Sequence, residues 1–352
     1  MASLVFSLAE RKPLNDDLRS RLAARSVALR LETIRPFAGS LERDPVHHST
    51  YYLAVDAPHG APWLLHMAPA AAPTSAIFAK PLLIGRMRRA TGPEIVLNAV
   101  PFGARDHDII GRFVQHINPV FQPRAQGGRP AIVMEASPAA FEGFRGILKS
   151  GNRNLAAIEL DAAAVADSYH AALWTAIRAG WREGFSAGIT VPLSGAEPGQ
   201  VKETIRQAAP LTRFTAAVGP VVGPGGVTPA LQAAERLHEL IRQTRAAARI
   251  TRPFDCELSL EGSPTPTTPG DQGFCLEWLR ERGHAAQLVA PQPGGDLAEL
   301  AAAARLGQCT LSFDARAADP AALARAAAGR VHLRRLGQSP EGLLAIAGQL
   351  RA

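Results

Sequence analysis

Alternating apolar and polar positions mark a short extended segment in the second half of the chain. In residues 254–260 every second residue is apolar, and the residues between them are Asp, Glu and Ser. This is the period of two that a β-strand imposes. Three prolines at 264–269 then prevent the strand from continuing, because proline lacks a backbone donor. Residues 270–282 have helical spacing before Gly283. The pattern predicts one unit of strand, polar loop and helix.

The same order of strand and helix recurs through residues 129–352. Strand-like runs occur at 131–135, 155–160, 186–191, 213–218, 254–260, 286–290, 309–313 and 330–333. Helix-like runs occur at 138–149, 168–182, 199–208, 229–245, 270–282, 296–304, 320–328 and 340–350. Eight alternating units predict an α/β fold with a parallel sheet that closes into a (β/α)8 TIM barrel. An open doubly wound sheet is the alternative, although no GxGxxG turn follows a strand.

The chain before the barrel has a different pattern. Alternating runs at 50–56 and 62–67 flank a turn and predict a β-hairpin, and 94–102 predicts another strand. Helices are predicted at 14–34 and from Asp106 to a stop at Pro119. The following segment is dense in proline and glycine, which is typical of a boundary. We therefore expect a smaller N-terminal α+β domain at 1–128 and the barrel domain at 129–352.

Composition narrows the classes of partner and location. The chain has 352 residues and a formal net charge of +7, but only four lysines, and its arginines are scattered rather than clustered between aromatic residues. This pattern argues against a nucleic-acid partner. No window approaches the ~20 apolar residues of a membrane span, and the N-terminal apolar run is too short for a signal peptide. Three cysteines without a CxxC pair are typical of a reducing compartment, so we expect a cytoplasmic protein of undetermined oligomeric state.

Polar residues at the ends of the predicted strands are the candidates for chemistry. In a barrel, the loops after the strands converge on one mouth, where the active site lies. The acids there are Glu135, Glu257, Glu261 and Asp314, and the candidate substrate-binding residues are Arg316, Arg334, Arg335 and Thr265. The acids suit acid–base chemistry, and the arginines suit binding of an anion. The alternative is that these charges are solvated or pair with one another.

Three stretches resemble the tagaturonate/fructuronate epimerases, bacterial enzymes that interconvert two epimeric keto-hexuronates. They are FDCELSLEGSPTPTTP at 254–269, QLVAPQPGGDLAEL at 287–300 and VHLRRLGQSPEGLLAIA at 331–347. The resemblance implies a divergent family member whose small-molecule ligand is a sugar acid. It also implies isomerase chemistry, of the epimerase kind, in carbohydrate metabolism.

The chain departs from the family pattern at several of its polar positions. The family's Val-Asp-Glu triplet corresponds to 260–262, which is Leu-Glu-Gly, and its Arg after Ala-Pro corresponds to Gln292. Its run containing His and Lys corresponds to 314–319, which contains neither residue. The resemblance therefore implies a rebuilt site, in which the four acids act as acid–base groups or hold a divalent metal through oxygen. The alternative is a catalytically inactive barrel homologue that serves as a binding or partner subunit.

Overall fold

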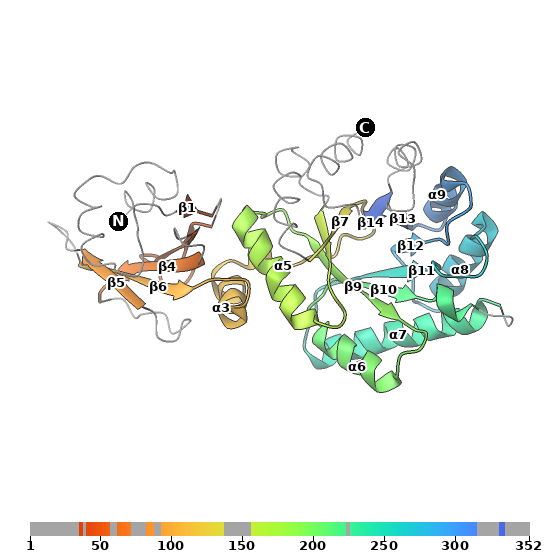
Figure 1. The fold of residues 1–352 in the computed structure, drawn as a ribbon, viewed down its shortest axis with the longest axis horizontal. Helices are drawn as coiled ribbons and strands as arrows, with labels where there is room; N and C mark the ends of the chain where they lie inside the picture. The colour runs from red at the N-terminus through yellow and green to blue at the C-terminus, as the bar shows by residue number, and fades with distance from the viewer. Residues whose placement is uncertain are drawn as a thin grey trace. The chain divides into compact units, whose positions relative to one another are not determined.

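The computed structural model describes residues 35–37, 40–56, 62–71, 82–87, 93–136, 156–222, 226–314 and 331–334. The chain divides into two compact units (Figure 1). The first comprises Met1–Gln122 and Leu173–Arg182, and the second comprises Pro123–Ala172 and Glu183–Ala352. The domain boundary expected after residue 128 stays a prediction. Predicted helices at 14–34, 138–149, 320–328 and 340–350 lie outside the described residues.

An antiparallel sheet forms the first unit. Its strands are β1 (Arg35–Pro36), β2 (Glu42–Arg43), β3 (Tyr51–Asp56), β4 (Pro62–Pro69), β5 (Leu82–Met87) and β6 (Ile95–Pro101). The order is β1-β3-β4-β6-β5, and β2 also pairs with β3. The predicted hairpin is confirmed as β3 and β4, in which Tyr51 lies opposite Met67. The pattern of 82–87 predicts no strand, and pairing with β6 makes this segment β5.

A short helical segment follows the sheet. It contains α3 (His107–Arg112), the π-helix Phe113–Ile117 and the 3-10 helix Pro119–Phe121. Asp106 precedes α3, and its carboxylate accepts a hydrogen bond from the Gly103 amide at 2.5 Å. The predicted helix from Asp106 to Pro119 is therefore confirmed, with its second half in π geometry.

Eight parallel strands close into a barrel in the second unit, as predicted. They are β7 (Ile132–Glu135), β8 (Ala156–Glu159), β9 (Ser186–Pro192), β10 (Arg213–Ala217), β11 (Asp255–Ser259), β12 (Leu288–Ala290), β13 (Thr310–Asp314) and β14 (His332–Arg334). Leu333 of β14 lies opposite Ile132 of β7, so the last strand pairs with the first. This pairing excludes the open doubly wound sheet.

Helices surround the barrel (Figure 1). They are α5 (Val165–Ala179), α6 (Pro198–Gln207), α7 (Thr228–Ala247), α8 (Pro269–Glu281) and α9 (Leu297–Leu306), and the 3-10 helix Gly219–Val221 follows β10. Helix α8 begins with a capping box, in which the Thr268 hydroxyl and the Asp271 carboxylate each accept the other residue's amide hydrogen. Among the described helices, none has the length and apolar character needed to cross a bilayer.

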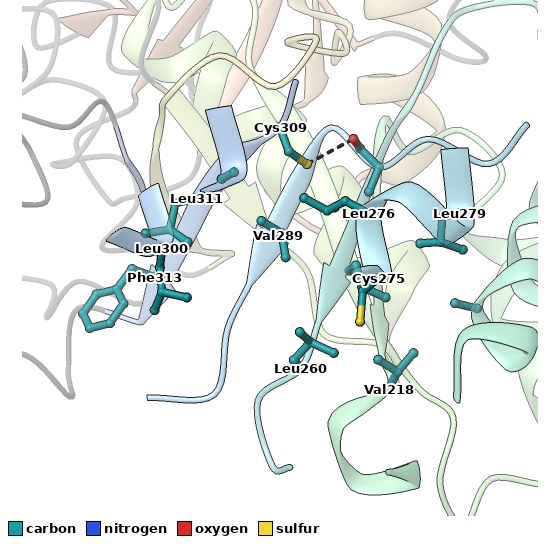
Figure 2. Close-up of a cluster of buried hydrophobic side chains, with 14 of the residues drawn as sticks. Val218, Leu260, Cys275, Leu276, Leu279, Val289, Leu300, Cys309, Leu311 and Phe313 are labelled. Carbon is teal, nitrogen blue, oxygen red and sulfur yellow. Dashed lines mark hydrogen bonds between the residues drawn. The ribbon is translucent and has the colours of Figure 1, made fainter. Parts of the chain in front are cut away.

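The apolar core of the barrel lies outside the ring of strands. Val289 of β12, Leu311 of β13 and Leu276 of α8 belong to one buried cluster (Figure 2). The buried Cys309 thiol donates to the Ala286 carbonyl at 3.1 Å, and burial raises the pKa of this thiol to about 12. Because side chains alternate along a strand, the residues between these apolar positions point into the barrel. Many of those interior residues are polar.

Candidate functional site

Arg334 joins two carboxylates across the barrel. Its Nε atom lies 3.2 Å from Glu257 Oε1, and its Nη2 atom lies 2.6 Å from Glu261 Oε1. Arg334 ends β14, whereas Glu257 lies in β11 and Glu261 follows it, and β12 and β13 separate these strands in the ring. The contacts therefore cross the interior, from the middle of β11 and the loop after it to the carboxyl end of β14, and barrel active sites lie at that end of the strands.

Glu257 is ionised despite its complete burial. Burial alone would raise the pKa of its carboxyl, but the positive charges of Arg334 and then Arg213 outweigh that effect and hold the pKa below its ordinary value. The hydroxyl of Thr215 also donates to Glu257 Oε2 at 3.1 Å. Glu261 is more exposed: 26% of its side chain is accessible to solvent, whereas none of the Glu257 side chain is. Glu261 is thus the carboxylate of the pair that a ligand could reach.

A second polar cluster lies deeper in the same interior. The Arg213 guanidinium forms an ion pair with Glu159 and contacts His332 Nε2 through Nη1 at 2.7 Å. The hydroxyl of Thr190 donates to the other Glu159 oxygen at 2.8 Å. Burial, followed by the positive charge of Arg213, lowers the pKa of His332 to about 3. His332 is therefore neutral at physiological pH, and its Nε2 atom accepts the hydrogen bond from Arg213.

Close backbone packing fixes the loops around Glu261. Gly219 lies against the Leu260 and Glu261 carbonyls, where a side chain would overlap them. The Gln292 side chain accepts a hydrogen bond from the Gly262 amide at 2.6 Å. The Gln292 amide in turn donates to the buried Thr267 hydroxyl at 2.8 Å. Gln292, which stands where the epimerase pattern has arginine, therefore ties the loop after β12 to the loop after β11.

The structure brings three of the eight predicted site residues together. Glu257, Glu261 and Arg334 form the ion-paired group. Glu135 is exposed at the end of β7, where its register partner is Glu159, and Asp314 is half-buried at the end of β13 opposite Arg334. Thr265 is exposed in the loop after β11, and Arg316 and Arg335 lie outside the described residues.

Three interior residues are not selected by a search at strand ends. Arg213 is the first residue of β10, Thr215 lies at its centre, and His332 begins β14. The alternation of side chains along β10 could have identified two of them. Arg213 and Thr215 share one face of this strand, and the apolar Phe214 lies on the other face. A charged residue on the face that normally fills a barrel with apolar side chains indicates an interior network.

The described carboxylates do not present the donor set of a metal site. Glu257 and Glu261 both face the Arg334 guanidinium, which competes with any cation for their oxygens. In the part of the chain that the structure describes, no group of three His, Cys, Asp or Glu residues could hold a metal ion. What the geometry offers chemically is one reachable carboxylate beside a fixed guanidinium.

The fold is similar to that of fructuronate-tagaturonate epimerase UxaE from Cohnella laeviribosi. The native structure of that enzyme has a TM-score of 0.59 at 16% identity, covering 91% of this chain and 74% of that chain. Its complex with one glycerol has a TM-score of 0.59 at 15% identity, with the same coverage of both chains. Its complex with two glycerols gives 0.57 at 17%, covering 92% and 75%. No family model and no curated protein matches the sequence. The resemblance expected from the three sequence stretches is thus confirmed at the level of the fold.

Proposed function

We propose that the chain is a cytoplasmic epimerase-type isomerase that acts on a sugar acid, a keto-hexuronate or a related compound. The observation that carries this proposal is the group of Glu257, Arg334 and Glu261 inside the barrel, in which Arg334 and Glu261 lie at the carboxyl ends of their strands. The similar fold of UxaE, whose name describes fructuronate-tagaturonate epimerase activity, supports the choice of substrate class. Barrel enzymes catalyse many different reactions, so the fold alone does not identify the reaction and the residues of the site have to support the choice.

The three residues suit the steps that epimerisation needs. Inversion of a carbon that bears a hydroxyl proceeds by a proton shuttle next to a carbonyl or by retro-aldol cleavage, and both require a base and a group that stabilises an enolate oxygen. We assign the base to Glu261, because its carboxylate is the accessible one. A single base suits the retro-aldol route: it takes the hydroxyl proton as the C–C bond breaks into an aldehyde and an enolate, and it returns the proton after the aldehyde has turned its other face and the bond has re-formed. Arg334 would stabilise the enolate oxygen. Glu257 would position Arg334, since it is buried and hydrogen-bonded to Thr215.

Binding of the substrate carboxylate falls to other residues. The Nε and Nη2 atoms of Arg334 already face Glu257 and Glu261, so no pair of its nitrogens is left for a bidentate contact with the substrate carboxylate. We assign that role to Arg316 and Arg335, which follow β13 and β14 in the sequence. Thr265, exposed on the loop after β11, would donate to a sugar hydroxyl. Glu135 and Asp314 would accept hydrogen bonds from other hydroxyls at the rim.

A second candidate is a catalytically inactive barrel homologue that serves as a binding or partner subunit. The ion pairing of Arg334 with Glu257 and Glu261 favours it, because paired groups stabilise a folded barrel without any reaction. The two candidates differ in whether the protein converts a bound ligand, with Glu261 as the base, or only binds it.

Proton NMR of the full chain with tagaturonate or fructuronate tests both candidates. We expect interconversion by the wild type and a loss of about 100-fold or more in Glu261→Gln, which removes the base but keeps the shape. The control is Glu203→Gln, an exposed acid on α6. Parallel assays with a chelator and with added Mg²⁺ or Mn²⁺ test whether the reaction requires a divalent metal. Binding without interconversion favours the inactive homologue, and the absence of both contradicts the sugar-acid proposal.

A further inference from the structure

An open hollow lined by arginines lies where α7 ends and the chain leads into β11. Its volume is about 500 Å³, and its lining includes Arg242, Arg245, Arg249 and Arg252 but no acidic residue. The hollow precedes the first residue of β11, whereas Arg334 is the last residue of β14 and its partner Glu261 follows the end of β11. Because the strands are parallel, the hollow belongs to the opposite face of the barrel from the mouth. The proposed epimerase reaction does not use it.

One arginine of the hollow is fixed before any ligand arrives. Arg245 is buried, and its guanidinium donates to the Ala209 carbonyl at 2.6 Å and to the Arg252 carbonyl at 2.5 Å. It also lies over the ring of Phe254, 5.1 Å from the centroid. Burial and then the charge of Arg252 lower the pKa of Arg245 to about 10. Arg245 therefore remains cationic at physiological pH, next to the positive charge of Arg252. An anion bound nearby would reduce the repulsion between these two charges.

The guanidinium of Arg249 has no partner among the residues that the structure describes. Arg249 is exposed just beyond α7 and has a φ of 56°, a left-handed conformation that favours glycine. Hydrogen bonds to the loop carbonyls of Ala209 and Arg252 account for the position of the Arg245 guanidinium, and Arg249 makes no such bond within the described part of the chain. Arg242, which lies on α7 itself, has one ion pair, with Glu239 at 3.5 Å. The hollow thus holds more positive charge than its own contacts neutralise.

We propose that this hollow binds a small anion that carries two linked phosphate groups. Guanidinium groups are planar forks that match phosphate oxygens, and several of them around one hollow suit a ligand with more than one charge. Its volume lies within the range of small-molecule sites, about 300–1,000 Å³. Ile250 and Pro253 add apolar surface to the lining, which an organic group attached to the phosphates would contact. The net charge of +7 favours the approach of such an anion.

Isothermal titration calorimetry of the full chain with inorganic pyrophosphate, at about 0.15 M salt, tests the proposal. Arg249→Gly removes one guanidinium and suits the left-handed backbone, so the folded state is retained. Arg242→Gln removes a second guanidinium. The matched control is Arg236→Gln, which removes the same charge from an exposed position of α7 outside the lining. We expect Kd for pyrophosphate to rise about fivefold or more in the two hollow variants and less than about twofold in the control.

Two further arms identify the source of the ligand. Tighter binding of ADP than of pyrophosphate assigns the site to phosphate esters, and the reverse order assigns it to inorganic polyphosphate. The absence of saturable binding overturns the proposal, as does equal weakening by all three substitutions, which would indicate general attraction. Preferential binding of a single-stranded oligonucleotide, lost in the same two variants, overturns it in favour of a nucleic-acid surface. None of these outcomes depends on keto-hexuronate turnover.

Discussion

Gly188 and Arg213 lie opposite each other on the adjacent strands β9 and β10, and a Cβ atom at position 188 would stand 2.5 Å from Arg213 Nε. The other register partner of Gly188 is Glu159, on β8. The Arg213 side chain therefore passes over Gly188 to reach the carboxylate two strands away. The missing side chain at 188 makes this ion pair possible.

The substitution Gly188→Ala should destabilise the barrel. The new methyl group would also lie 2.9 Å from Arg213 Cβ, which cannot rotate away as the end of a side chain can. Overpacking of this kind costs about 1–3 kcal/mol, which urea unfolding followed by circular dichroism would measure. The control is Gly199→Ala on α6, where no atom lies within 4 Å of the added Cβ. A free energy of unfolding that is equal in the two variants would contradict the account of Gly188.

Arg334→Met should reverse part of the pH dependence of stability. In the wild type the pKa of Glu257 is lowered from 4.5. The ionised Glu257 therefore stabilises the folded state above pH 4.5, and this stabilisation is lost as the pH falls through the lowered pKa. Without Arg334, burial dominates and raises the pKa of Glu257, so the variant should lose stability as the pH rises from 5 to 8. Breaking a buried pair costs about 3–5 kcal/mol. The control is Arg206→Met, in an exposed pair with Glu203. An unchanged pH profile of the urea midpoint would refute the assigned electrostatics.

His332→Gln should make the protein less sensitive to acid. The pKa of His332 is about 3 in the folded protein, against an ordinary value of 6.5. The unfolded chain therefore takes up the proton first, and the free energy of unfolding falls as the pH drops between these two values. The variant keeps an acceptor for Arg213 but does not titrate. Between pH 7 and pH 5 it should lose about 2 kcal/mol less stability than the wild type. His48→Gln, at an exposed position, is the matched control, and parallel losses in both variants would argue against a neutral His332.

Two threonines of the loop after β11 should respond differently to valine. The hydroxyl of Thr267 is buried and accepts from the Gln292 amide at 2.8 Å, so Thr267→Val leaves that donor unsatisfied at a cost of about 1–3 kcal/mol. Thr265→Val, at an exposed position, should leave the melting temperature unchanged. If the proposed function holds, Thr265→Val should also raise KM for the keto-hexuronate. A destabilised Thr265→Val variant would show that Thr265 is structural.

The alternation of residues was enough to predict the barrel and part of its site. All eight predicted strands occur, because each run has the period of a strand and each is separated from the next by a helix or a breaker. Arg334 and Glu261 could be found because they lie just beyond the ends of such runs, and Glu257 because it is an acid within one of them. Arg213 and His332 were missed, because a search at strand ends does not consider the interior-facing positions at the beginning of a strand.

Local pattern thus encodes the number, type and order of the elements, since periodicity depends on residues near one another in the chain. The partners of the charged residues depend on closure of the ring. Arg334 meets Glu257 and Glu261, and Arg213 passes over Gly188, only when strands distant in sequence take their positions around one interior. Register and burial then set which carboxylate is enclosed and which is reachable, because both are properties of the assembled barrel and of no single segment.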